Sequence, residues 1–475
     1  MSKRILIVVP NRTTFVTAWC FELAFEYASA GDSVFLLDLA HYETRYRENS
    51  IYWVADRVQE SNDIRDIVKP ILKNQENVTL LNPRSIVSKR FNKDLTESEN
   101  SVFEFVIRSM YARKFGSRQI AIDDLSPSLI RRELNSYSIV LNSLRNHLVE
   151  VDYDAIVTVN GRGLFDSCAV TVAKENKLKY LLVEKTSDNW DYYSVQEIST
   201  HSALEVQGKV DSFFERYLKE HSLQEAQLRA SEYYAKPARE QKYWLDLQTG
   251  ETDISANLSK SVIFFPSSDH EFSTHSDPAD LTAPYKNQFE AFQDLAAECK
   301  KLKLQVIVRV HPHPPGSVLQ IQEDKIWRAV CEGASAQFIG SSDPMNSLRL
   351  AKAAHLNIVY TSTFGAEIAF HELPLLVLGD TTYAHLLPGT YIRRIGKIEK
   401  ALQSPVIPYR NQITPWLIYR LYGEIELKHF KIIEFDHVLF EGKRLNKPRR
   451  RILSCIQFLA SLKVKKSIFV KSNSR

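Results

Sequence analysis

The segment from Asn357 to Asp380 constrains the fold most, because it reads as a strand, a helix and a second strand in close succession. The apolar run Asn357–Tyr360 predicts a buried strand, and the hydroxyl-rich turn Thr361–Thr363 follows it. Phe364–Phe370 contains helix-forming residues with an apolar face, and a proline shortly afterwards ends the helix. Leu375–Leu378 is the next apolar run. The segment therefore predicts a βαβ unit with parallel strands.

The turn of this unit has the composition of an anion site. The free amides at the start of a helix attract negative charge, and Ser362 and Thr363 add hydroxyl donors. Glu367 lies one helical turn after Thr363, on the same face, where a carboxylate is placed to accept hydrogen bonds from ribose hydroxyls. The alternative is structural: Thr363 caps the helix and Glu367 complements the helix dipole.

A second polar group follows the predicted strand Leu304–Val310. Arg309 lies near its end, and His311 precedes Pro312, which disfavours helix at that position. Ligands of open α/β sheets bind outside the carboxyl ends of the strands, so Arg309 and His311 are candidates to hold a diphosphate together with Ser362 and Thr363. His311 is alternatively a structural histidine. A metal site with His313 is a further alternative, but no third or fourth ligand is evident, and we expect no metal.

Length and composition limit the class of protein. A chain of 475 residues predicts two domains of roughly 200 residues each, and 44% hydrophobic with 25% charged residues is typical of a globular protein. The five cysteines are scattered without CxxC spacing, which predicts reduced thiols. The net charge of +4 does not indicate nucleic-acid binding. The first residues contain too short an apolar run for a signal peptide, and no window is long enough to span a membrane, so we expect a cytoplasmic protein.

The first half of the chain alternates predicted strands and helices, beginning with Arg4–Val9 and Ser33–Asp38, and it lacks the GxGxxG pattern of a dinucleotide site. A helical insertion is expected at about residues 85–150. Two later strands end in polar groups: Ala155–Asn160 is followed by Arg162, and Lys179–Glu184 ends in a carboxylate with Asp188 nearby. These residues are alternatively part of an ordinary solvated loop.

The predicted fold class is α/β, with two Rossmann-like domains in tandem. The first domain is expected at residues 1–250 and the second at 261–430, with a polar linker between them. A basic tail follows at 431–475. Asp269 lies in the loop after the first strand of the second domain, Ser261–Phe265.

Four motifs resemble bacterial capsule and surface-polysaccharide biosynthesis proteins, the group that includes the Kdo transferases with the two-domain GT-B fold. They begin at Asn160-Gly161-Arg162 with Glu184 downstream, and continue with Pro266-Ser267-Ser268-Asp269-x-Glu271-Phe272, Arg309-Val310-His311-Pro312 and Tyr360-Thr361-Ser362-Thr363-x-Gly365-x-Glu367. The chain departs from the family pattern at Phe370-His371-Glu372 and at His313.

The resemblance implies a glycosyltransferase that moves a sugar from a nucleotide-activated donor to a surface glycan or a lipid-linked precursor. No DxD pattern lies at a strand end, since Asp152-Tyr153-Asp154 precedes its strand, so we expect the enzyme to need no metal, and we expect no cofactor. Arg309, His311, Ser362 and Thr363 would hold the donor phosphates and Glu367 the ribose. Glu184 would be the general base, with Asp269 and Asp188 as further candidates. Asn160, Arg162 and Asp188 would lie on the acceptor side.

Three other functions remain open. Teichoic-type polyol-phosphate transferases resemble the same layout, and sugar-nucleotide 2-epimerases share the two-domain fold. The chain is alternatively a non-catalytic protein that binds glycan or nucleotide within an assembly complex.

The basic charge is confined to the end of the chain. No acidic residue follows Glu441, and the Lys and Arg residues after it contribute +11, which leaves −7 for the rest. Ile452–Leu462 is a short apolar helix candidate with cations on both sides. This pattern predicts peripheral attachment to the anionic inner face of the cytoplasmic membrane. The alternative is a helix packed on the first domain with a solvated end.

Overall fold

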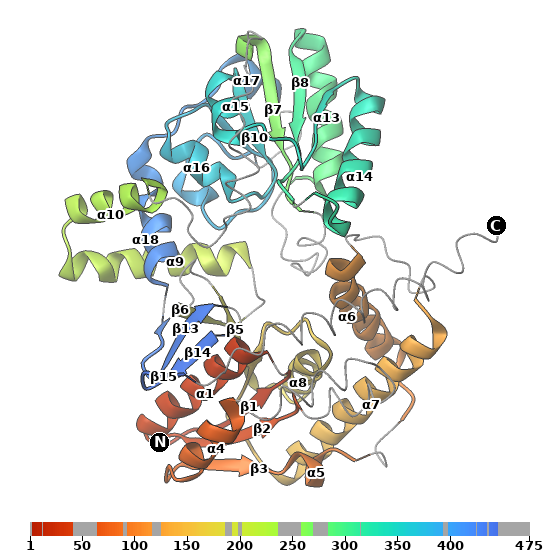
Figure 1. Cartoon of the computed structure of the whole chain (residues 1–475), viewed down its shortest axis with the longest axis vertical. Helices are drawn as coiled ribbons and strands as arrows, with labels where there is room; N and C mark the ends of the chain where they lie inside the picture. Colours follow the sequence, from red (N-terminus) through yellow and green to blue (C-terminus); the bar gives the residue numbers. More distant parts are fainter. Residues whose placement is uncertain are drawn as a thin grey trace. The chain divides into compact units, whose positions relative to one another are not determined.

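The computed structural model describes residues 2–11, 13–40, 64–88, 93–115, 125–185, 192–197, 202–235, 258–268, 284–313, 315–392, 398–423, 425–434 and 437–444. The chain divides into two compact units. The first comprises Met1–Met110, Ala121–Thr200 and Gly423–Arg475, and the second comprises Tyr111–Ile120 and His201–Tyr422. Figure 1 labels the helices and strands of the two units.

The first unit is built on a seven-stranded sheet in the order β12-β6-β5-β4-β1-β2-β3. The five strands from β3 to β5 are parallel, and β6 and β12 are antiparallel additions at one edge. The strands are β1 (Arg4–Val9), β2 (Ser33–Asp38), β3 (Val78–Leu81), β4 (Ala155–Val159), β5 (Lys179–Glu184), β6 (Tyr192–Gln196) and β12 (Ile425–Glu426). The helices are α1 (Thr14–Ser29), α4 (Ile64–Lys73), α5 (Pro83–Ile86), α6 (Glu97–Phe115), α7 (Pro127–Glu150) and α8 (Leu164–Glu175).

The second unit contains a five-stranded, fully parallel sheet in the order β11-β10-β7-β8-β9. Its strands are β7 (Ser261–Phe265), β8 (Gln305–Arg309), β9 (Gln337–Ile339), β10 (Leu356–Val359) and β11 (Leu375–Val377). The helices are α9 (Ala203–Glu220), α10 (Leu223–Ala235), α13 (Gln288–Leu302), α14 (Val318–Ala334), α15 (Ser347–Ala353), α16 (Phe364–Phe370), α17 (Ile398–Gln403) and α18 (Thr414–Tyr422). Short 3-10 turns lie at Leu258–Lys260, Ala384–Leu386 and Arg410–Ile413.

Both faces of this second sheet are buried, because successive residues of each strand pack into different cores. Along β7, Ile263 and Phe265 pack with residues of α15, α16 and α18. Val262 and Phe264 pack with residues of α13, α14 and α17. Figure 1 shows α13 and α14 beside β8, with α15 and α16 beside β10. Burial on both sides explains why the strands are continuous apolar runs rather than alternating ones.

The two sheets share one strand order. Numbered within each unit, the five parallel strands run 3-2-1-4-5, which is the Rossmann order 3-2-1-4-5-6 without its sixth strand. The order reverses between β1 and β4 in the first unit and between β7 and β10 in the second. The predicted fold class, α/β with two Rossmann-like domains, is therefore confirmed, including the βαβ unit formed by β10, α16 and β11.

The structure differs from the predicted boundary at residue 250. Helices α9 and α10 belong to the second unit, where Val206, Val210 and Ala230 join the core formed with Trp416 and Tyr419. The polar, charged exterior of these helices hid their buried stripe in the sequence. Apart from the short segment 111–120, the chain enters the second unit near residue 200 and returns to the first unit near residue 422.

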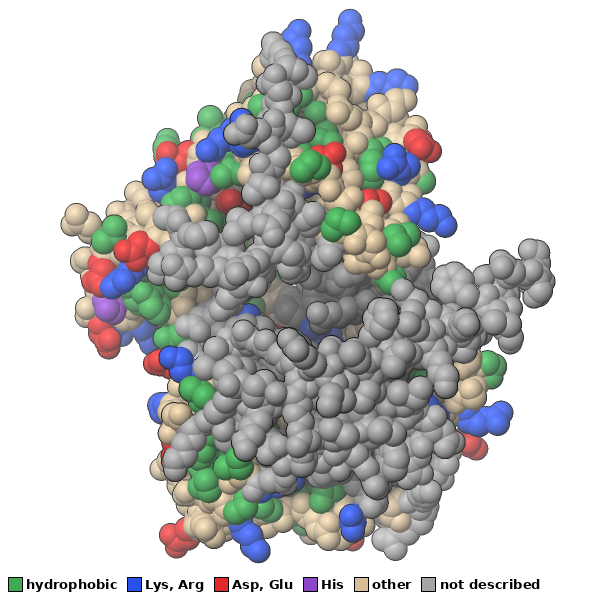
Figure 2. Space-filling view, viewed as in Figure 1, with side chains coloured by type: hydrophobic (Ala, Val, Ile, Leu, Met, Phe, Trp, Pro, Cys, Tyr) green, Lys and Arg blue, Asp and Glu red, His purple; other side chains and the backbone are tan. Residues whose placement is uncertain are grey.

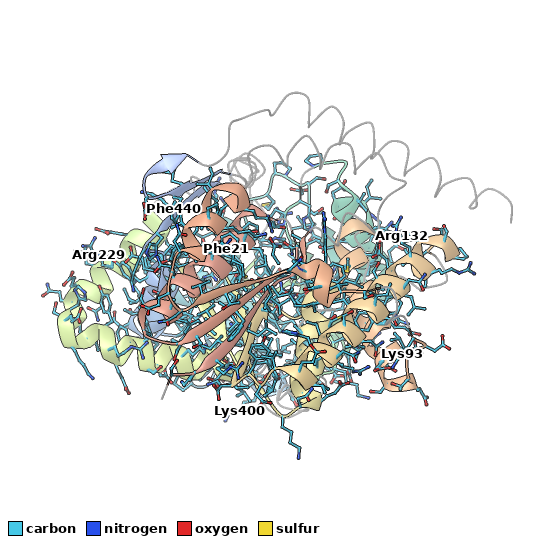
Figure 3. All side chains as sticks on the ribbon, turned by 90° about the horizontal axis from the view of Figure 1, so that it is seen from below. Phe21, Lys93, Arg132, Arg229, Lys400 and Phe440 are labelled. Atoms are coloured by element: carbon cyan, nitrogen blue, oxygen red, sulfur yellow. The ribbon has the colours of Figure 1, made fainter. Side chains whose placement is uncertain are left out.

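The predicted tail also begins differently, because residues 430–434, 437–440 and 443–444 form a three-stranded sheet. Its strands are β13 (Phe430–Glu434), β14 (His437–Phe440) and β15 (Lys443–Arg444). Phe430 and Phe440 belong to the core cluster that contains Phe21 of α1, and Figure 3 labels Phe21 and Phe440. The remaining tail, including the helix expected at Ile452–Leu462, lies outside the described residues.

A buried carboxylate fastens this sheet to α1. The Glu22 side chain has 0% exposed surface, accepts hydrogen bonds from the backbone amides of Lys428, His429 and Phe430, and contacts Nδ1 of His429 at 3.1 Å. The His429 ring also stacks on Phe25, with ring centroids 4.6 Å apart. A buried carboxylate is tolerated because its oxygens are satisfied by these donors.

Candidate functional site

The turn at residues 360–363 lies at the carboxyl end of β10, beside the point where the strand order of the second sheet reverses. Two glycines hold it in place by close approach. A Cβ on Gly379 would lie 2.6 Å from the carbonyl oxygen of Tyr360, and one on Gly365 would lie 2.1 Å from the hydroxyl of Tyr383. The Tyr383 hydroxyl donates a 2.6 Å hydrogen bond to the carbonyl of Ser362. The turn is therefore fixed by packing from two sides.

The hydroxyl groups of this turn have different roles. The Ser362 hydroxyl accepts a 3.3 Å hydrogen bond from the amide of Phe364, the first residue of α16. Ser362, and not the N-cap residue Thr363, therefore supplies the side-chain oxygen at the start of this helix. Thr363 is exposed, and its side chain makes no capping hydrogen bond. The structure thus differs from the interpretation of Thr363 as a simple cap.

Glu367 lies in α16, one turn from Thr363, and is half-buried. Burial raises the pKa of its carboxyl group to about 7, and the charge of Lys352 opposes this shift only in part. Within the described part of the chain, no hydrogen bond or ion pair to this carboxylate is found. A ligand that donates hydrogen bonds to such a half-buried carboxylate would stabilise its ionised form.

At the end of β8, Arg309 and His311 have separate environments. The Arg309 guanidinium is buried and donates hydrogen bonds to the backbone carbonyls of Gly340, Asp343 and Met345 and to the hydroxyl of Ser347. These bonds fasten the loop between β9 and α15, so the structure uses Arg309 to hold a loop instead of presenting it to a phosphate. Burial lowers the pKa of Arg309 to about 10. His311 is exposed at the end of β8.

Side chains from the ends of β7 and β10 meet across the reversal point. The hydroxyls of Ser267 and Thr361 lie 3.2 Å apart. The next residue, Ser268, lies 3.2 Å from Nε2 of His313, which is itself 3.1 Å from Oε2 of Glu323. Ser267 and Ser268 belong to a motif seen in the sequence, but neither they nor Glu323 were predicted to have a role. The only available signal was a run of hydroxyl residues after a predicted strand.

In the first unit, the structure brings together three predicted residues at the ends of β4 and β5. Arg162 Nη2 lies 3.5 Å from Oε2 of Glu184, and the Arg162 amide donates to Oδ1 of Asn160. Burial raises the pKa of the Glu184 carboxyl. The charge of Arg162 opposes this rise in part, as do the hydrogen bonds that Glu184 accepts from the Lys185 amide and from the side chains of Asn160 and Arg162. A carboxyl with a raised pKa in a partly exposed position is chemically suited to accept a proton.

Asp166, which fills the turn between β4 and α8, was not among the residues predicted from the sequence. Its carboxylate is buried and accepts hydrogen bonds from backbone amides at the start of α8, including that of Gly163. Burial nevertheless raises the pKa of Asp166 to about 6. A Cβ on Gly163 would lie 2.4 Å from Oδ1 of Asp166, so the carboxylate occupies the space above the turn.

Other expected groups are not placed. Asp188 and Asp269 lie outside the described residues, and their assigned roles stay predictions. Among the residues that the structure describes, no group of three or more His, Cys, Asp or Glu side chains has the arrangement of a metal site. The same described residues include no helix with the length and apolar character needed to cross a membrane. On the face drawn in Figure 2, exposed charged side chains of both signs are visible.

Comparison with known proteins identifies similarity through structure alone. No family model matches the chain, and no curated protein matches it. Among solved structures, the UDP-GlcNAc 2-epimerase of Methanocaldococcus jannaschii, in complex with UDP-GlcNAc and UDP, is 11% identical. The match covers 88% of this chain and 98% of that one, with a TM-score of 0.28.

Two structures of KpsC from Thermosulfurimonas dismutans are also similar. The beta Kdo 2,7 transferase is 13% identical, with 68% of this chain and 89% of that chain covered and a TM-score of 0.32. The beta Kdo 2,4 transferase is 12% identical, with 64% and 87% covered and a TM-score of 0.33. The structural neighbours therefore include both Kdo transferases and a UDP-GlcNAc 2-epimerase.

Proposed function

We propose that this chain is a glycosyltransferase that takes a sugar from a nucleotide-activated donor and adds it to a surface polysaccharide or its lipid-linked precursor. The donor nucleotide binds to the second unit, where β7 and β10 end. The reaction needs no metal and no cofactor beyond the donor itself.

One observation carries this assignment: the reversal point of the second sheet is lined by hydroxyls and is followed by a carboxylate that lacks a partner among the described residues. Ser267 and Thr361 meet across the reversal point, and Ser362 and Thr363 continue the hydroxyl row. Neutral donors at a strand end suit a diphosphate, and a carboxylate one turn behind suits a ribose. In this proposal the Glu367 carboxylate accepts hydrogen bonds from the ribose hydroxyls of the donor nucleotide.

The roles of the other donor-side residues follow from their contacts. His311 is exposed at the end of β8 and contacts the diphosphate, where it stabilises the charge that develops on the leaving group. Arg309 is not retained as a direct ligand, because its donors already bind the loop that follows β9. It acts by holding that loop in place.

The first unit supplies the acceptor side of the reaction. Glu184 is the proposed general base, and Asn160 and Arg162 hold it at the end of β5. Asp269 and Asp188 remain further candidates for proton transfer or acceptor binding. Peripheral binding to an anionic membrane through the basic tail remains part of the proposal, since the acceptors of surface-glycan synthesis include lipid-linked glycans.

The deciding experiment measures binding of CMP, UDP, GDP and CDP to the purified protein by calorimetry, in the presence of EDTA. Binding of one nucleotide with a clear preference is expected. The matching nucleotide sugars and CDP-alditols are then incubated with and without a glycan acceptor. A transferase releases nucleotide in step with acceptor modification, whereas an epimerase converts the donor without any acceptor. No binding by any of the four nucleotides would contradict the proposal.

Two variants test the assigned roles. His311→Ala is expected to lower turnover about a hundredfold, the scale of losing one charge-stabilising donor. His355→Ala is the control, because His355 lies at the amino end of β10, the end opposite to the proposed site. Glu184→Gln keeps the shape of the side chain and removes its basicity, so donor binding should persist while transfer is lost. Normal transfer by Glu184→Gln would move the base to another residue, and Asp269 would be tested next.

A further inference from the structure

Two sets of side-chain contacts, linked through the backbone of two consecutive serines, join the strand ends of the second sheet, and we call them the strand-end network. The network consists of Glu323, His313, Ser268, Ser267 and Thr361. The two serines are consecutive residues after β7, His313 follows β8, and Thr361 follows β10. The network therefore spans three neighbouring strands and crosses the point where the strand order reverses.

The anchor of this network is buried. His313 is 4% exposed and Glu323 is 2% exposed, and the two side chains are 3.1 Å apart. Ser268 is 3% exposed and Ser267 is 6% exposed. Buried polar groups are costly unless they are satisfied, so a set of buried contacts in this position fixes the spacing of the elements that carry it.

Two further contacts connect the anchor to its surroundings. The His313 ring meets the ring of His311 edge-on, with centroids 5.2 Å apart, so the buried histidine supports the exposed one. The amide and carbonyl of Ser267 are both bonded to the side chain of Gln288, at the start of α13. The loop after β7 is thus held from the helix, from β8 and from β10.

The geometry differs from that of a hydrolytic triad. Ser268 and Glu323 both approach the same nitrogen, Nε2, of His313. In a Ser-His-Asp triad the serine and the carboxylate use opposite ring nitrogens, so that the acid can orient the base that removes the serine proton. Ser268, at 3% exposure, is also shielded from a substrate. The arrangement is suited to holding elements in place rather than to nucleophilic attack.

We propose that His313 is a positioning residue for the nucleotide site. The ring of His313 orients the side chain of His311, which faces the diphosphate. Through Ser268 and Ser267, His313 also holds the turn that contains Thr361. This inference rests on the proposed function for the identity of the ligand, but the mechanical coupling along the network does not depend on that identity. Groups that orient ligand-binding side chains in metal sites change affinity by about 10–100-fold when removed, which sets the expected scale.

The first test follows backbone hydrogen exchange in the protein without nucleotide. Ser268→Ala removes one hydroxyl from the network and should fold normally, whereas Ser268→Thr keeps a hydroxyl at that position. Ser268→Ala is expected to speed exchange severalfold in peptides covering residues 311–313 and 361–366, and Ser268→Thr to restore it. His355→Asn is the matched control, because His355 precedes β10 at the amino ends of the strands and contacts the carbonyl of Leu402 there. Faster exchange confined to residues 266–268 would overturn the proposal.

The second test measures the dissociation constants of CMP, UDP, GDP and CDP. His313→Gln and Thr361→Val are each expected to weaken binding of the preferred nucleotide about tenfold. The double variant should be only about as weak as one single variant, because both changes break the same network. Losses that multiply to about a hundredfold would show independent effects and would contradict the coupling. If the wild-type protein binds none of the four nucleotides, the proposed function fails, and the exchange experiment still decides whether the network couples the strand ends.

Discussion

The two reversal points of this chain have the same strand order but different contents. In the first unit, the turn after β4 is filled by the chain itself, since the Asp166 carboxylate accepts the amides at the start of α8. In the second unit, the turn after β10 carries Ser362 and Thr363. The only acid of α16 is Glu367, one helical position later than Asp166 in α8, and among the described residues it accepts no hydrogen bond from the amides of its turn. The same strand order therefore leaves a turn without a carboxylate bound to its amides only in the second unit, which is where we propose that the donor phosphates bind.

This comparison explains why the donor nucleotide is assigned to one unit. A phosphate approaching the turn after β4 would meet a carboxylate, and like charges at short range repel. The turn after β10 offers hydroxyl groups instead. The following experiments test whether this difference between the two turns decides where the nucleotide binds.

Gly379→Ala should have the largest effect. The added Cβ would lie 2.6 Å from a backbone oxygen that cannot move easily, so the turn after β10 must shift. We expect a loss of stability of about 3 kcal/mol and nucleotide binding weakened about a hundredfold or more. Thermal unfolding and calorimetry measure the two effects.

Gly333→Ala is the control for this variant, because Gly333 lies within α14 and a Cβ added there would meet nothing within 4 Å. That change should stabilise the protein slightly, by up to about 1 kcal/mol. Unchanged nucleotide binding by Gly379→Ala would place the site away from this turn.

Glu367→Gln should weaken nucleotide binding about 10–100-fold, because hydrogen bonds to a charged acceptor contribute about 1.5–3 kcal/mol. Glu332→Gln, an exposed position in α14, is the matched control. A ribose analogue lacking its hydroxyls should bind both proteins with equal, weak affinity. A variant that binds the nucleotide as tightly as the wild type would remove Glu367 from the site.

The same variant has a second signature in its dependence on pH. The pKa of Glu367 in the folded protein, about 7, lies above the ordinary value of 4.5, so the ionised carboxylate destabilises the folded state. This destabilisation is fully present above pH 7 and disappears as the pH falls towards 4.5. Glu367→Gln should therefore be more stable than the wild type at pH 8, by on the order of 1 kcal/mol, and the difference should shrink towards about pH 5. Thermal unfolding across this range measures it, and a difference independent of pH would contradict the assigned pKa.

Asp166→Ala tests the first unit. Removing the carboxylate leaves amides of the turn without an acceptor, so we expect a loss of stability of about 1–2 kcal/mol. Nucleotide affinity, measured by calorimetry on the folded variant, should not change. A lower nucleotide affinity in Asp166→Ala would show that the first unit also contacts the donor.

Thr363→Ala should have the smallest effect on stability, within about 0.5 kcal/mol, since this exposed side chain makes no capping bond. Nucleotide binding should nevertheless weaken measurably, because the hydroxyl is assigned to the diphosphate. Calorimetry and thermal unfolding on the same sample separate the two. A loss of stability without a loss of affinity would return Thr363 to a structural role.

Much of the fold was predictable because buried parallel strands leave a strong signal. Runs such as Arg4–Val9 and Ser261–Phe265 are almost entirely apolar, and the strands are observed at these residues. Helix α9 was assigned to the wrong unit, since only Val206 and Val210 are buried in it and its surface is charged. Local sequence shows that such a helix exists, but which core buries its stripe depends on contacts with α18, far along the chain.

The sequence predicted which strand ends carry the residues of the candidate site, but it did not predict the contacts between their side chains. Asn160, Arg162 and Glu184 are brought together because their strands are neighbours in the sheet. Arg309 looked like a phosphate ligand, but its long side chain reaches backbone carbonyls of the next loop. The Glu323–His313 pair joins a helix to a loop, and no spacing rule links a carboxylate in α14 to a histidine ten positions earlier across an intervening turn.

The Glu22 contact has a consequence for the order in which the protein is made. Glu22 emerges from the ribosome early, yet the amide of Lys428 that satisfies it lies 406 positions later. At about 5–20 residues per second, this carboxylate waits on the order of 20–80 s for its partners. The second unit is synthesised entirely within that interval. The unit that begins first is therefore the one that finishes last, and a chain stopped before residue 428 would leave α1 with an unsatisfied carboxylate in place of a completed core.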